Sequence, residues 1–171
     1  MTAQNDLLDE LEKGVVVDGV VSSVFKGLKI INMESTKLAA KGDLYFVISH
    51  RFGSVKSGVK DLFGLDDSNI RFSFVYGFSD WFNAGISRSS YNKTYDAHVK
   101  YRLIQQEEGR FPVTIVGYNS VEINTSLDKV NYPNLETKHR YMYAYEFLIS
   151  RKFNEQLSLE LSPIYLHQNF V

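Results

Sequence analysis

Between residues 70 and 170 the chain repeats one unit, a β-prone run with bulky side chains at alternate positions that ends in a polar turn. Strand side chains alternate with a period of two, whereas a helix groups residues three and four apart. Roughly nine to eleven tilted residues cross a bilayer in a membrane barrel, with apolar side chains outside and polar ones inside. The unit therefore predicts an all-β fold, an antiparallel up-and-down transmembrane β-barrel with about seven or eight strands in this chain.

The clearest strand covers residues 95–103, where polar and apolar side chains alternate without exception. One face suits lipid and comprises Tyr95, Ala97, Val99, Tyr101 and Leu103, and the other suits water and comprises Asp96, His98, Lys100 and Arg102. Residues 70–78, 82–89, 140–150 and 157–162 alternate in the same way, although Met142 and Leu148 interrupt one polar face. Residues 113–124 alternate poorly, so their faces stay unassigned.

Composition excludes several other classes of protein. No stretch approaches the roughly eighteen apolar residues of a membrane helix. The net charge is −1 and the basic residues are spread along the chain, which argues against a nucleic-acid partner. The chain has no cysteine, which excludes disulfides, cysteine-ligated zinc and thiol catalysis.

The connections between the predicted strands alternate between short and long, as expected for periplasmic turns and outer loops. The short ones are 79–80, 107–112 and 154–156, and the others are 51–68, 90–94 and 126–137. With the short turns in the periplasm, the strand that ends near Phe170 points outward. A complete barrel returns both ends to the periplasm, so we expect this chain to stop before the barrel closes.

Residues 1–24 form a separate acidic or tether segment, ahead of a barrel domain at residues 25–171. Residues 2–4 resemble the remainder of a secretory cleavage site, so we expect a signal peptide to be removed or absent here. Residues 6–13 favour one or two turns of helix. The glycine-containing run that follows predicts a strand, a tether or a plug that enters the lumen.

Several strings resemble, in order, an uncharacterised outer-membrane β-barrel family of Bacteroidota that is known as a domain of unknown function. They are FKGLKIINMESTKLAAKGDLYFVISHRFGS, GISRSSYNKTYDAHVKYRLI, FPVTIVGYNS and FLISRKFNEQLSLELSPIYLHQNF. The resemblance covers residues 25–171 and implies a secreted barrel whose members are longer than this chain. It brings no substrate and no active-site pattern with it.

Charged side chains on the polar faces of different strands form the candidate site, as a paired lumen network or the lining of a pore. An unpartnered buried charge costs several kcal/mol, so pairing or water is required. The predicted network comprises Arg71, Asp96, His98, Lys100, Arg102, Arg140, Glu146 and Glu160.

Other chemistry finds less support in the residue spacing. The four histidines lack the short spacing of a metal site, and no cofactor motif occurs. A hydrolase on the barrel wall would use Ser87 or Ser89 with His98, but no G-x-S-x-G turn is present. We therefore expect no enzymatic activity and no cofactor.

Two kinds of residue fit a membrane interface. Tyrosines near strand ends predict an aromatic girdle, among them Tyr91, Tyr95, Tyr118, Tyr132, Tyr141 and Tyr143. Arg88 would face lipid in strict alternation, but near a strand end it can extend to the headgroups.

The sequence as a whole predicts a non-enzymatic outer-membrane barrel that acts as a pore, a transport accessory or a membrane scaffold. Its expected partners are outer-membrane lipid and a small-molecule solute. The alternative is a soluble lipocalin-like barrel or β-sandwich that binds a hydrophobic ligand, with the apolar face inside; both give the same periodicity.

Overall fold

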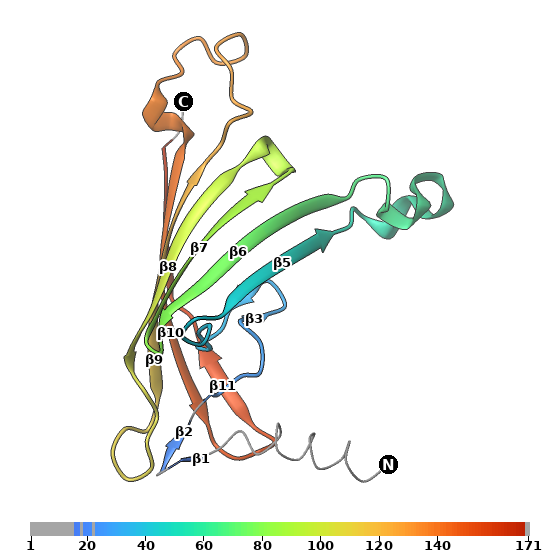
Figure 1. Cartoon of the computed structure of the whole chain (residues 1–171). Helices are drawn as coiled ribbons and strands as arrows, with labels where there is room; N and C mark the ends of the chain where they lie inside the picture. Colours follow the sequence, from blue (N-terminus) through green and yellow to red (C-terminus); the bar gives the residue numbers. More distant parts are fainter. Residues whose placement is uncertain (1–15, 18, 22, 170–171) are drawn as a thin grey trace.

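The computed structural model describes residues 16–17, 19–21 and 23–169, and one curled antiparallel sheet dominates it (Figure 1). The strands of this sheet are β5 (Leu44–Arg51), β6 (Asn69–Ser79), β7 (Phe82–Ser89), β8 (Tyr95–Ile104), β9 (Thr114–Ile123), β10 (Tyr141–Lys152), β11 (Ser158–Leu161) and β12 (Ile164–Gln168). Two small hairpins precede it, β1 (Val16–Val17) with β2 (Val20–Val21) and β3 (Lys29–Ile30) with β4 (Met33–Glu34). Three 3-10 helices lie in the connections, η1 (Val55–Gly64), η2 (Tyr91–Lys93) and η3 (Thr137–Arg140).

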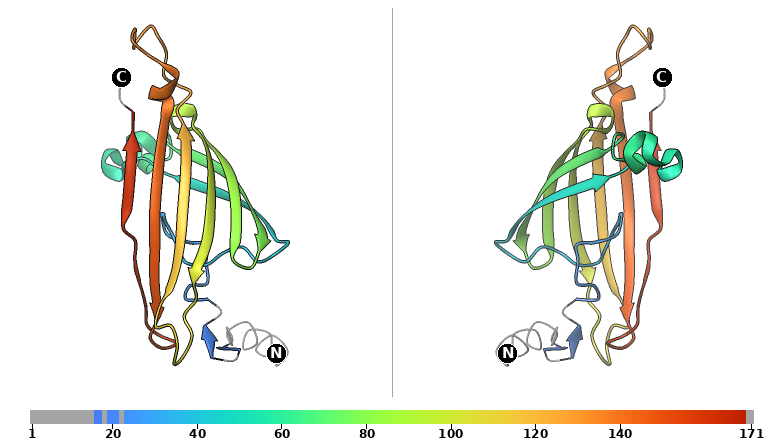
Figure 2. Two further views of the ribbon diagram at one scale, coloured as in Figure 1. Left: turned by 90° about the vertical axis from the view of Figure 1, so that its left-hand side faces the viewer. Right: turned by 90° about the vertical axis from the view of Figure 1, so that its right-hand side faces the viewer.

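Neighbouring strands in the sequence are neighbours in the sheet, from β5 at one edge to β11 at the other. β12 continues β11 along the same edge of β10, because Glu160 opposite Ser150 and Ile164 opposite Glu146 keep one register. The described sheet thus has seven strand positions and curls into a half-barrel (Figure 2). This confirms the predicted all-β antiparallel fold, an incomplete barrel.

The two faces of the sheet have the polarity that alternation predicts. On the convex face, large apolar side chains such as Phe46, Phe74 and Phe147 are about half exposed. On the concave face, Asp96 and Lys100 are buried. The paired residues Phe74 and Ile86 share one face and Ser73 and Ser87 the other, so the alternation is in register across strands.

β9, whose faces the sequence left open, follows the same geometry with different residue types. Its register puts Tyr118 opposite the inward Lys100 and Gly117 opposite the outward Tyr101. A Cβ on Gly117 would lie 2.5 Å from the Tyr101 ring, and the Asn119 side-chain amide donates to the Tyr101 hydroxyl at 3.2 Å. The large tyrosine of β8 thus covers the small and polar residues of β9, which hides the alternation in the sequence.

Short connections lie at one end of the half-barrel and two long ones at the other. Residues 80–81, 105–113 and 153–157 join strands at the end that carries β1 and β2, and residues 52–68, 90–94 and 124–140 lie at the opposite end (Figure 1). The connection 90–94 is shorter than 105–113, so the lengths do not alternate strictly. β12 runs toward the long connections, where the Asn169 side chain donates to the Lys138 carbonyl oxygen at 2.9 Å. Phe170 itself lies outside the described residues. Within the described chain, no helix has the length and apolar character needed to span a membrane.

A stretch that we term the lumenal segment, residues 23–43, crosses the concave face of the sheet (Figures 1 and 2). The Thr36 backbone N–H donates to Glu160 Oε2 at 3.1 Å, and its hydroxyl lies 2.6 Å from that of Ser150. On the other side, the Gly42 N–H donates to the Gly77 carbonyl oxygen at 2.8 Å. One segment therefore connects β6 with β10 and β11 through the lumen.

The segment that crosses the lumen begins later than the run that the sequence singled out. Residues 19–21 instead bind the turn between β8 and β9, where the Val21 N–H donates to the Gln106 carbonyl oxygen at 3.0 Å. Residues 1–15, including the helical turns expected at 6–13, lie outside the described residues.

The lumenal segment also supplies a small apolar core. Leu38 packs against Val116 of β9 and Leu148 of β10, both of them fully buried, with Tyr118 at the margin. Leu148 interrupts the polar face of its strand in the sequence because it faces an apolar side chain that comes from more than a hundred residues earlier. Such contacts anchor the segment by the burial of apolar surface.

The tightest approach of the segment to the sheet is at Gly77. A Cβ there would lie 2.0 Å from the Ala40 carbonyl oxygen, so only glycine fits. We expect Gly77→Val to displace the segment and to raise the rate of trypsin cleavage after Lys37 and Lys41 by about tenfold or more, since local opening exposes these bonds. Phe78→Leu, at the adjacent outward position, is the matched control, and trypsin should cleave it at the wild-type rate. Equal rates for both variants would contradict the contact.

Candidate functional site

A cavity of about 360 Å³ lies on the concave side, between the lumenal segment and the strands β5 to β8. The segment contributes Lys29 and Glu34 to its lining, and the strands contribute Arg71, Asn83 and Lys100 among others. Most of these side chains can form hydrogen bonds or carry charge. The cavity is therefore a polar pocket that is partly roofed by the chain's own N-terminal region.

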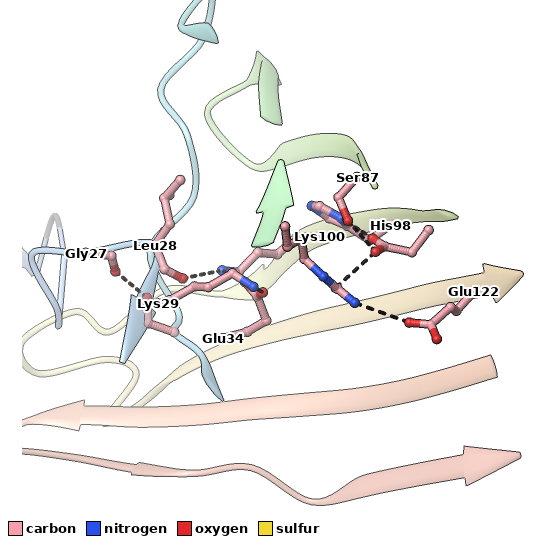
Figure 3. A network of polar contacts seen from close by, with 11 residues as sticks. Gly27, Leu28, Lys29, Glu34, Ser87, His98, Lys100 and Glu122 are labelled. Carbon is pink, nitrogen blue, oxygen red and sulfur yellow. Dashed lines mark hydrogen bonds and ion pairs between the residues drawn. The ribbon is translucent and has the colours of Figure 1, made fainter. Parts of the chain in front are cut away.

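The first polar cluster in the pocket joins the segment to β8 (Figure 3). Lys100, which is only 2% exposed, lies with its Nζ 3.2 Å from Glu34 Oε2 and donates to the Leu28 carbonyl oxygen at 3.2 Å. Lys29 lies 2.7 Å from the other oxygen of Glu34. Burial alone raises the pKa of Glu34, but the charges of Lys100 and Lys29 outweigh it, so the pKa lies below its usual value of 4.5. Glu34 is thus a buried carboxylate between two ammonium groups.

The second polar cluster lies farther along β8 and joins four strands. Arg71 of β6 reaches Asp96 of β8 at 3.0 Å and Glu122 of β9 at 3.3 Å. The Ser87 hydroxyl of β7 donates to Asp96 Oδ1. Because a forked guanidinium can serve two carboxylates at once, this cluster is a charge-paired network rather than a row of separate charges.

In the part of the chain that the structure describes, two inward side chains have buried polar atoms that lack hydrogen-bond partners: Asn83, which lies opposite Lys100, and His98, which lies between Lys100 and Asp96 on β8. Asn83 is 1% exposed, and neither its Nδ2 nor its Oδ1 has a partner among the described residues. His98 Nδ1 is also without a hydrogen bond in the described chain, although it lies 3.9 Å from Asp96 Oδ2. Each unpaired buried group costs roughly 1–3 kcal/mol, and such a group in a folded protein calls for an explanation.

Of the eight residues expected in the network, the structure brings Arg71, Asp96, His98 and Lys100 to the pocket. Glu160 instead binds the lumenal segment, and Glu146 Oε1 has no partner among the described residues. Arg102 binds Gln105 at the end with the short turns, and Arg140 binds the Asn124 carbonyl oxygen at the end with the long ones. Since those two arginines cap opposite ends of the sheet, they do not belong to the pocket.

Sequence reasoning did not include Glu34, Asn83, Tyr118 and Glu122 in the predicted network. Asn83 lies on the polar face predicted for residues 82–89, but it was left out because the predicted network contains only ionisable residues. Tyr118 faces the lumen, where its ring lies 5.3 Å from that of His98, and is therefore not part of the girdle expected of it. Glu34 had no strand pattern around it, so no sequence signal placed it opposite Lys100.

The groups considered for other chemistry are arranged differently from a catalytic or metal site. Ser87 donates to Asp96, and no hydrogen bond between it and His98 occurs in the described chain. The described residues include no group of three or more histidine or acidic side chains placed to hold a metal ion.

Comparison with known proteins finds one match for this chain. The model of the family described as "Membrane bound beta barrel domain (DUF5777)" matches residues 25–171. No curated protein and no solved structure matches the chain. The match includes the whole sheet and most of the lumenal segment.

The ion pair of Lys100 and Glu34 provides a test of how the segment is held. Lys100→Met leaves the buried Glu34 with Lys29 alone, so we expect trypsin cleavage within the segment to accelerate about 10- to 100-fold. Adding Glu34→Gln should bring the cleavage rate part of the way back to that of the wild type, because the buried carboxylate of Glu34 is then gone. Additive effects of the two substitutions would show that the side chains do not interact.

The lowered pKa of Glu34 predicts an acid-induced loosening of the segment. Its folded-state pKa is below 4.5, so its contribution to stability is complete above about pH 4.5 and is lost as the pH falls through the lowered pKa. A fluorophore on Asn32→Cys, a unique cysteine here, should gain mobility in fluorescence anisotropy over this range. Glu34→Gln should remove that step, while protonation of Asp96, Glu146 or Glu160 would leave it in place.

Proposed function

Because the chain belongs to the membrane bound beta barrel domain family over residues 25–171, we propose a specific location and role for it. It is part of a bacterial outer-membrane barrel from the Bacteroidota. It is not an enzyme. It admits small polar solutes through its lumen, and the lumenal segment gates their passage. Its partners are outer-membrane lipid and the solute, with no role for nucleic acid.

The outer membrane is supported by the length and polarity of the strands. β6 has 11 residues, β8 and β9 have 10 each and β10 has 12, close to the roughly nine to eleven needed to cross a bilayer when tilted. Their convex side chains are apolar and their concave ones polar. A lipocalin-like protein requires the opposite arrangement, in which the apolar side chains line the interior and charged residues such as Lys100 lie on the solvent-exposed outer face.

The two edges of the sheet support closure by further strands. β5 and the β11–β12 edge each have only one neighbouring strand in the described sheet. Unpaired backbone groups are costly in a bilayer, since no water is there to pair with them. We assign closing strands to a region beyond this chain, as in longer members of the resembled family, and the short-turn end to the periplasm.

One observation carries the gated pore: a polar pocket in the lumen lies against a segment that hydrogen bonds and ion pairs hold in place. The unpaired amide of Asn83 has both a donor and an acceptor to offer to a solute. The Lys100–Glu34 pair and the contacts of Thr36 can exchange for contacts with water when the segment moves. A scaffold would have no need of a binding pocket beside a releasable segment.

Location is tested on the full-length protein with its own signal. We expect recovery in the outer-membrane fraction and a gel mobility that changes on boiling in detergent. Release as a soluble periplasmic protein would overturn the proposal and favour a ligand-binding barrel with its apolar face inside.

Gating is tested by locking the segment to the wall. The Thr36 and Ser150 hydroxyl oxygens are 2.6 Å apart, so Thr36→Cys with Ser150→Cys places two thiols within disulfide reach, in a chain that has no cysteine of its own. The oxidised double variant in planar bilayers should have a conductance at least about tenfold lower than the reduced one. The conductance of each single variant should be the same with and without reductant. Equal conductance in both states would contradict gating, and no conductance in either would favour a scaffold.

A further inference from the structure

The convex face of the sheet carries a continuous apolar groove. Two adjoining hollows, of about 650 Å³ and about 430 Å³, share Phe74, Ile86, Ala97 and Val121 in their linings. They extend over strands β6 to β10, whose order Figure 1 shows. This groove is on the face opposite the lumenal pocket and is independent of it.

Strand register explains why a groove forms here. Across the sheet, outward residues at one level run Tyr76, Ala84, Val99, Asn119 and Tyr145, and at the next level Phe74, Ile86, Ala97, Val121 and Tyr143. Large rings stand at both ends of each row and smaller side chains lie between them. The aromatic residues of β6 and β10 are thus the walls, and residues such as Ala84 and Ala97 are the floor.

One end of the groove carries a positive charge. Arg88 lies at the end with the long loops, paired with Tyr95 across β7 and β8, and its guanidinium carbon is 4.7 Å from the centre of the Tyr95 ring. Among the outward-facing residues that line the groove in the described chain, Arg88 alone is charged. Within the described chain it forms no ion pair with a carboxylate, and its guanidinium donates a hydrogen bond to the Ser89 carbonyl oxygen.

An unpaired cation at the end of an apolar groove on a membrane-facing surface matches the chemistry of a lipid. Four residues separate Ala84 from Arg88, which is about 13 Å at about 3.3 Å per strand residue. One leaflet contributes about 15 Å of the roughly 30 Å hydrocarbon core. The groove therefore follows a large part of an acyl chain, though not its full length, when Arg88 lies at the headgroups, where arginine is tolerated.

We propose that this groove is a specific lipid site, in which an acyl chain lies along Ala84 and Ala97 and the lipid phosphate binds Arg88. A guanidinium can bind two phosphate oxygens at once, and the Tyr95 ring holds it in position. The ligand is a glycerophospholipid, because one guanidinium and one groove fit a single phosphate and its acyl chains. The inference rests on the membrane location and not on the gated pore.

The test measures phosphatidylglycerol bound to the full-length protein by native mass spectrometry in a non-ionic detergent. We expect one lipid to remain bound after delipidation and titration, and Arg88→Gln to weaken its binding about tenfold or more. Ala97→Phe, which fills the floor, should abolish binding. Arg151→Gln, which removes an outward arginine at the opposite end of the sheet, is the matched control and should bind as the wild type does.

Two further probes separate the headgroup from the chain. Diacylglycerol, which has the acyl chains without the phosphate, should bind at least about tenfold more weakly than phosphatidylglycerol; equal binding would overturn the role of Arg88. Lipid A, titrated in the same way, should bind more weakly than phosphatidylglycerol, and tighter binding would overturn the assignment to a glycerophospholipid. Equal lipid binding by all variants, or a second protein copy that binds in place of lipid, would overturn the site. Heat-modifiable gel mobility checks that each variant is folded.

Discussion

The structure depends on one constraint, that successive side chains of each strand face two different environments. Because register has a period of two, a slip of one residue would turn every charged residue of β8 outward and every aromatic one inward. Unpaired charges would then face the membrane, at a cost of several kcal/mol each. The lumenal network and the convex groove both follow from the same register, since they are the two faces of the same strands.

Alternation in the sequence was sufficient to predict β6, β7, β8, β10 and β11 with their faces, because each contrasts large apolar with polar residues. It failed for β9, where Tyr101 of the neighbouring strand covers Gly117 and Asn119. It also gave no hint of the lumenal segment. Glu34 meets Lys100 across 66 residues of sequence, and Thr36 meets Glu160 across 124, so only the folded sheet brings these partners together.

The interior combines two ways of filling a small barrel. Leu38, Val116 and Leu148 pack as an ordinary core, whereas Lys100, Glu34, Arg71 and Asp96 neutralise one another. Ion pairs of this kind contribute modestly to stability, because desolvation offsets much of their attraction. Their value lies in geometry, since a charge pair of this kind fixes which residue of the segment faces which strand. Among the described residues, this complementarity is incomplete at Asn83 beside Lys100, at Nδ1 of His98 and at Oε1 of Glu146.

The neighbour-to-neighbour order of the sheet bears on how such a molecule is assembled. Each strand joins the one that precedes it in the chain, so a strand needs to close only a short loop before it pairs. Pairing of this kind can advance from one strand to the next. The lumenal segment does not share this order, because its partners on β10 and β11 lie near the end of the chain. The lumen is therefore filled by residues that precede the sheet in the chain, and their contacts with β10 and β11 can form only when those strands are in place.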